Sequence, residues 1–164
     1  MLGFYFTRSI RPISLCLLAV LVASCGTSPK GKYLKYTGDN LKQNEGVIHI
    51  CRTSSLVGAM GGIDVFINNE IVANIANGSV VEVVKSAGMQ VVIFRLGNGS
   101  QFGVKVNLNP EGHSYVLQTA SLNSLKVLPF GLVGTNMGWQ SLVVDKSTFE
   151  GNCSTYSTLK IQMP

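Results

Sequence analysis

The sequence predicts an all-β fold, a small antiparallel β-sandwich that follows an apolar leader and a polar connecting segment. From Val47 onward, short runs rich in Val, Ile and Phe are separated at close spacing by Gly and Asn, as in strands joined by tight turns. Beyond the leader no stretch keeps the apolar period of a helix, so helix content should be small. Nine or ten short strands of this kind favour a sandwich or a barrel.

The strands follow one another closely along the chain. The clearest covers 102–108, where apolar and small or polar residues alternate. Asn68-Asn69 tolerates the positive φ of a tight hairpin turn between two strands. A loop with three glycines covers 53–62, and a short helix is allowed only near 121–124 or 146–150. The expected strands cover 47–52, 63–68, 70–74, 80–84, 89–96, 102–108, 113–120, 125–128, 140–145 and 156–162.

The N-terminus has the pattern of a bacterial secretory signal peptide. Arg8 and Arg11 precede an apolar run of eleven residues, 13–23, which is far shorter than the roughly 20 residues of a membrane-spanning helix. The sequence Val-Ala-Ser-Cys that ends at Cys25 resembles the lipobox of bacterial lipoproteins. This resemblance implies that Cys25 carries a diacylglyceryl group and becomes the N-terminus once the leader is removed. An uncleaved anchor and a plain secretory signal are the alternatives.

Three segments follow from this: a lipoprotein signal peptide (1–24), a lipidated N-terminus with a flexible tether (25–45) and a β-sandwich domain (46–164). Removing the leader takes away two of the 13 basic residues and none of the eight acidic ones, which leaves a mild net charge of +3. The lysines of the tether are consistent with weak attraction to anionic lipids, although a solvated spacer is the simpler interpretation. No basic face interleaved with aromatic residues is present, so nucleic-acid binding is not expected.

The resemblance to lipoproteins also implies a location. Gly26 follows the cysteine in place of the aspartate that retains such proteins at the inner membrane. We therefore expect attachment to the outer membrane, on its periplasmic side, in an organism with two membranes.

The cysteines reduce to one candidate pair. Cys16 belongs to the leader and Cys25 to the lipidation site, which leaves Cys51 and Cys153 in a compartment that permits disulfides. We predict a Cys51–Cys153 bridge, with two separate thiols as the alternative. With His49 and His113, these cysteines also match the ligand types of a zinc site, but no two of the four have the usual ligand spacing, so no metal is expected.

Three stretches resemble a family of bacterial lipoproteins that has no established catalytic activity. The first covers 47–58, a strand followed by Arg-Thr-Ser-Ser. The second is a hairpin that begins at Asp64 with Asp-Val-Phe-Ile-Asn-Asn-Glu. The third is Asn-Gly-Ser at 77–79, followed by Ala-Gly-Met-Gln-Val at 87–91. The hairpin is also similar to PEGA-type surface-layer domains. The resemblance implies a small sandwich of the transthyretin or PEGA type. It departs from the family pattern at Thr53, Asn69 and Val80, and beyond Asn109 little of it remains apart from Tyr115.

One stretch, 125–139, is apolar and rich in glycine, is interrupted by Pro129 and ends at the single tryptophan. One interpretation is a strand, a bend and a core tryptophan. The other is an apolar loop that docks on a partner or on the membrane, with contacts from Phe130, Leu132, Met137 and Trp139.

No sequence motif indicates catalysis. There is no nucleophile elbow, zinc-protease motif, P-loop or Rossmann glycine set, and no cofactor is expected. The sequence therefore favours a non-catalytic binding or scaffold module of the cell envelope with a possible envelope protein partner. The alternative is a carrier of an apolar ligand or lipid within the β-domain, which the 46% hydrophobic composition favours. An enzyme is the third possibility.

Overall fold

The structure is a computed structural model that describes residues 27–29, 34–35, 41–55, 61–127 and 133–162. The side chains of 121–127 and 133–137 lie outside the description, as does the segment with Phe130 and Leu132. The elements are β1 (Ser28–Pro29), β2 (Leu34–Lys35), β3 (Glu45–Arg52), β4 (Ile63–Ile67), β5 (Glu70–Ile75), β6 (Ser79–Ser86), β7 (Gly88–Arg95), β8 (Gln101–Leu108), β9 (His113–Val127), β10 (Val133–Val144), α2 (Lys146–Cys153) and β11 (Ser157–Gln162).

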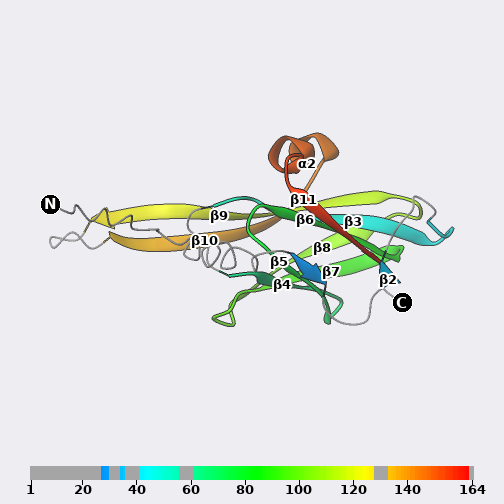
Figure 1. Ribbon diagram of the computed structural model, residues 1–164, viewed down its shortest axis with the longest axis horizontal. Helices are drawn as coiled ribbons and strands as arrows, with labels where there is room; N and C mark the ends of the chain where they lie inside the picture. Colours follow the sequence, from blue (N-terminus) through cyan, green and yellow to red (C-terminus); the bar gives the residue numbers. More distant parts are fainter. Residues whose placement is uncertain (1–26, 30–33, 36–40, 56–60, 128–132, 163–164) are drawn as a thin grey trace, which may run out of the picture.

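The strands form two facing sheets, which confirms the predicted all-β sandwich. One sheet has five strands in the order β1-β5-β4-β7-β8, and the other has six in the order β10-β9-β3-β6-β11-β2 (Figure 1). Most neighbouring strands are antiparallel, as predicted. Two pairs in the six-stranded sheet are parallel instead, β3 with β9 and β6 with β11.

The core lies between the sheets and contains one side chain from every second position of the central strands. Ile48 and Ile50 of β3 are fully buried, as are Val65 of β4 and Phe94 of β7. This alternation is the burial expected of strands with one face on a core. The predicted alternation of 102–108 is also confirmed, because Val106 and Leu108 are buried while the residues between them face outward.

The predicted hairpin turn forms between β4 and β5. Asn68 has a φ of 50° and Asn69 a φ of 68°, the left-handed conformation that asparagine adopts more readily than most residues. The turn is closed further by a hydrogen bond from the Val91 N–H to the Asn68 side-chain oxygen, 2.9 Å long, which ties it to β7.

Two predicted boundaries were wrong in the last third of the domain. The region 121–124, where a helix was allowed, and 125–128, predicted as a separate strand, both belong to β9, while β10 begins at Val133 and not near 140. A register shift opposite Asn136 and Met137 leaves Asn123 unpaired as a bulge, so the irregular sequence spacing there is compatible with one continuous strand. The helix expected near 146–150 is present as α2.

The segment expected to be a flexible tether contributes to both sheets. Ser28 and Pro29 pair with Asn74 and Ala73 of β5, and Leu34–Lys35 pairs with the end of β11. Such short pairings leave no periodic pattern in the sequence, which is why the tether was expected to extend to residue 45. Within the described residues, no helix is long and apolar enough to cross a membrane.

Candidate functional site

The predicted disulfide is present and connects the middle of the sandwich to α2. Cys51 of β3 and Cys153 at the end of α2 are bonded, with their Cα atoms 6.4 Å apart, and both are buried. Asp145 starts the helix by accepting a hydrogen bond from the Thr148 N–H at 2.8 Å. The helix then packs Phe149 and Cys153 onto the outer face of the six-stranded sheet, in a small apolar cluster with Leu117. The disulfide is therefore part of a second, smaller core.

His49 and His113 meet beside this cluster. Nε2 of His49 lies 2.9 Å from Nδ1 of His113, and the His49 ring stacks on Tyr115 at 4.7 Å between centroids. Glu82 lies 3.4 Å from His49 and 3.2 Å from Lys160. The hydrogen bond with His49, followed by the nearby Lys160, lowers the pKa of Glu82, while burial and the charge of His49 lower the pKa of His113.

This arrangement does not provide the zinc site that was considered. Both cysteine sulfurs are used in the disulfide, so neither is available as a thiolate ligand. Among the described residues, no group of three or more His, Cys, Asp or Glu side chains is placed to hold a metal ion. His49 and His113 instead belong to a packed polar cluster of the sheet.

The segments that resemble the lipoprotein family meet at one end of the sandwich. Nη1 of Arg52 donates to the carbonyl oxygens of Gly61 at 2.9 Å and Ile75 at 3.0 Å, although only 2% of Arg52 is exposed. Ser55 exchanges two hydrogen bonds with Asn77 across the same junction. Arg52 thus joins β3 of one sheet to β5 of the other. Arg52, Ser55 and Asn77 therefore have structural roles that the sequence alone did not reveal.

A two-stranded arm leaves the sandwich at this same end. β3 pairs with β9 only as far as Gln118, and beyond that residue the described partner of β9 is β10 (Figure 1). The nine residues from Thr119 to Val127 extend the arm by roughly 30 Å at the usual rise of a strand. In the sequence 114–144, Lys126 is the only charged residue.

The bulge at Asn123 places the apolar residues of the arm at the register positions of one face. Because strand residues alternate between faces, omitting Asn123 from the pairing brings Leu122 and Leu125 to register positions on the same face as Trp139. Without the bulge these two leucines would occupy opposite faces. The full set on that face is Ala120, Leu122, Leu125, Val127, Val133, Thr135, Met137 and Trp139; the opposite face has Thr119, Ser121, Ser124, Lys126, Gly134, Asn136, Gly138 and Gln140.

Of the four residues predicted to contact a partner, the structure describes Trp139 and the backbone of Met137. Trp139 lies at the root of the arm, where it packs against the core, 6.4 Å from the Phe102 ring and 5.9 Å from the Arg52 guanidinium. Trp139 therefore has the core position that the simpler interpretation expected. Met137 falls within the arm, and Phe130 and Leu132 lie outside the described residues.

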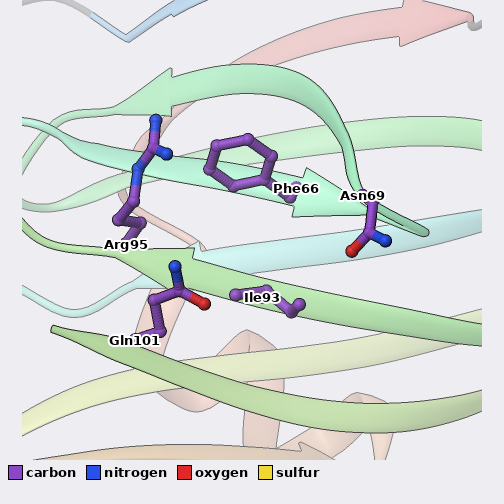
Figure 2. Close-up of a pocket in the computed structure, with 5 residues that line it drawn as sticks. All are labelled: Phe66, Asn69, Ile93, Arg95 and Gln101. Atoms are coloured by element: carbon purple, nitrogen blue, oxygen red, sulfur yellow. The ribbon is translucent and has the colours of Figure 1, made fainter. Parts of the chain in front are cut away.

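A shallow pocket lies on the outer face of the other sheet. It has a volume of about 150 Å³ and is lined by Phe66, Asn69, Ile93, Arg95 and Gln101 (Figure 2). These residues come from β4, the β4–β5 turn, β7 and β8, so sequence patterns could not have grouped them. Figure 2 shows Arg95 beside the Phe66 ring, with Ile93 on the same strand as Arg95 and Gln101 on the next strand.

Comparison with known proteins adds no relative. No family model matches this chain, and neither the curated proteins nor the solved structures include a detectable match. The resemblance to the lipoprotein family stays a prediction from the sequence motifs.

Proposed function

We propose that this protein is a lipid-anchored, non-catalytic binding module of the bacterial cell envelope, held by a diacylglyceryl group on Cys25 at the periplasmic side of the outer membrane. The leader and the Val-Ala-Ser-Cys sequence support the anchor. The observation that carries the binding role is the arm formed by β9 and β10: its apolar residues occupy the register positions of one face, and β10 is the edge strand of its sheet among the described strands.

The anchor and the arm are at the same end of the domain. Thr27 is fixed there, because its hydroxyl accepts a hydrogen bond from the Ala76 N–H at 3.1 Å and contacts the Ser79 hydroxyl. Only Gly26 lies between Thr27 and Cys25, so the chain reaches about 7 Å at most from the lipidated residue to the domain. A lipid on Cys25 would hold this end of the sandwich against the membrane.

Strand pairing then relates this end to the arm. Ser79 is opposite Arg52 in the sheet, and Arg52 is opposite Gln118, after which the arm begins. The arm therefore starts at the membrane-proximal end in this proposal. This position suits an element that meets a partner close to the bilayer.

The chemistry of the arm favours a protein partner. A two-stranded ribbon alone is at best marginally stable in water, and a long uncharged edge strand readily pairs with another chain. β10 is an edge strand of twelve residues without a charged side chain or a proline. Its backbone groups need hydrogen-bond partners that lipid tails do not supply. We propose that the partner is an envelope protein that offers a strand edge and an apolar surface.

Site-specific photocrosslinking in intact cells tests this proposal. A crosslinking residue at Thr135, which is opposite Leu125 in the arm, should capture one envelope protein, identified by mass spectrometry. The same residue at Glu150, exposed on α2, is the matched control and should not capture that protein. Deleting Asn123 removes the bulge and should abolish the crosslink, while the unfolding temperature of the sandwich stays unchanged.

Three results would contradict the proposal: capture of only a second copy or only lipid from Thr135, equal capture from Glu150, or a crosslink unaffected by the deletion. A carrier of an apolar ligand remains the alternative function. No observation within the described residues favours it, because the side chains of both sheets share one contiguous core.

A further inference from the structure

The outer face of the five-stranded sheet has one polar row and one apolar row of side chains. In the polar row, Asp64 is opposite Arg95, and Arg95 is opposite Gln101. In the apolar row, Phe66 is opposite Ile93, and Ile93 is opposite Gly103. Gly103 has no side chain, so the apolar row leaves a gap on β8 beside Ile93. The pocket lies where these two rows adjoin (Figure 2).

Arg95 is held in a fixed position but remains accessible. Its guanidinium carbon lies 4.5 Å from the centroid of the Phe66 ring, and Nη2 is 3.4 Å from a carboxylate oxygen of Asp64. Asp64 is itself held by a hydrogen bond from the Asn74 amide at 2.8 Å. Nevertheless 42% of the Arg95 side chain is exposed, so a ligand can reach the guanidinium, which carries five N–H donors in a planar fork.

The size and charge of the pocket limit the ligand. A volume of about 150 Å³ is comparable to a cavity that holds one benzene ring. Arg95 is the charged residue that lines the pocket, and Asp64 offsets part of its charge. A monoanion therefore matches the site better than a doubly charged phosphate. The amides of Asn69 and Gln101 add polar groups at its edges.

We propose that this pocket binds a ligand in which a single carboxylate is attached to one six-membered ring. The carboxylate pairs with the fork of Arg95, and the ring lies against Phe66 and Ile93 in the opening beside Gly103. A sugar acid and an aromatic acid share this chemistry. The site lies on the opposite sheet from the arm, so the proposal stands independently of the function proposed above.

Titration of the full-length protein in detergent micelles, followed by amide chemical shifts, tests the proposal. D-glucuronate and benzoate are the probes, and D-glucose and acetate are the controls that lack the carboxylate or the ring. At least one ring acid should bind about tenfold or more tightly than both controls, because glucose lacks the carboxylate that pairs with Arg95 and acetate lacks the ring that contacts Phe66 and Ile93. The better of the two identifies the type of ring.

Two variants locate the site. Arg95→Gln should weaken binding of that acid at least about tenfold, and Lys146→Gln on α2 removes the same charge far from the pocket and should leave it unchanged. Gly103→Val fills the opening beside Ile93 and should also abolish binding; its Cβ meets its nearest atom at an ordinary 3.4 Å. Binding by neither acid, equal binding of glucose, or full affinity in both Arg95→Gln and Gly103→Val would overturn the proposal.

Discussion

Asn77 and Ser55 hold each other by two reciprocal hydrogen bonds. The Ser55 N–H donates to the Asn77 side-chain oxygen at 3.1 Å, and the Asn77 amide donates back to the Ser55 carbonyl at 3.1 Å. These residues belong to two of the segments that resemble the lipoprotein family. Their pairing fixes the chain that leaves β3 against the turn before β6. It accounts for both motifs as parts of a structural junction.

Replacing Asn77 with Ala should therefore destabilise the domain by about 2 kcal/mol, since each hydrogen bond contributes about 1 kcal/mol. Urea unfolding followed by circular dichroism measures the loss. Asn107→Ala, at an exposed position of β8, is the control and should change the free energy of unfolding by no more than about 0.5 kcal/mol. Equal effects of the two changes would show that the Ser55–Asn77 pairing does not stabilise the junction.

Arg52 should matter more, because its removal leaves two carbonyl oxygens without their donor. Arg52→Met keeps the apolar stem but loses the bonds to Gly61 and Ile75. We expect a loss of about 3 kcal/mol, since a hydrogen bond from a charged group contributes about 1.5–3 kcal/mol and the Ile75 carbonyl is buried. Lys105→Met, at an exposed position, should have little effect on the urea midpoint. If Arg52→Met unfolds at the wild-type urea concentration, the proposed link between the sheets is not important for stability.

The Cys51–Cys153 bridge should contribute strongly to stability. It joins residues 102 positions apart, and a loop of that length corresponds to about 4–5 kcal/mol by chain entropy. The Cys51→Ala/Cys153→Ala double variant should lose most of this amount, together with some packing around Phe149. Thermal unfolding with and without reductant measures it: the wild type should shift on reduction and the variant should not. A wild-type curve that reductant leaves unchanged contradicts this prediction.

His113 should make stability fall as the pH falls below its ordinary pKa of 6.5. Burial lowers the pKa of His113 in the folded protein, so the unfolded chain takes up a proton at higher pH than the native state does. This contribution is complete above the ordinary value of 6.5 and is lost as the pH falls toward the lowered value. His113→Gln keeps a hydrogen-bonding group beside His49 but cannot titrate.

Urea unfolding at about pH 7.5 and pH 5.5 measures this effect, and the wild type should lose more stability than His113→Gln between the two. Glu82 and Asp145 do not interfere in this window. The pKa of Glu82 is lowered from 4.5, and hydrogen bonds from Ser147 and Thr148 lower the pKa of Asp145 to about 2. An equal loss in both proteins would mean that His113 does not titrate as its surroundings require.

Features that depend on residues close together in the chain could be predicted from sequence patterns. The alternation along β8, the positive φ at Asn68-Asn69, the helix after Asp145 and the pairing of the two remaining cysteines were all accessible from sequence. The parallel pairing of β3 with β9 was not, because β4 to β8 lie between these two strands in the chain. Nor was the pocket, whose Phe66 and Arg95 meet only through the register of β4 and β7.

The arm shows most clearly why the strand boundaries near 121–128 were predicted wrongly. Leu122 and Leu125 are three residues apart, which breaks the alternation of a strand. The bulge at Asn123 restores the period, but a bulge is defined by the pairing with β10 and cannot be read from β9 alone.

The most direct measurement of the central claim is metabolic labelling with palmitate, combined with fractionation of membrane and soluble proteins. The wild type and a Cys16→Ala variant should both carry the label and sediment with the membrane, because Cys16 lies in the leader. Cys25→Ala should carry no label and appear in the soluble periplasmic fraction. If Cys25→Ala remains labelled or stays with the membrane, Cys25 is not the lipid anchor and the proposed attachment is wrong.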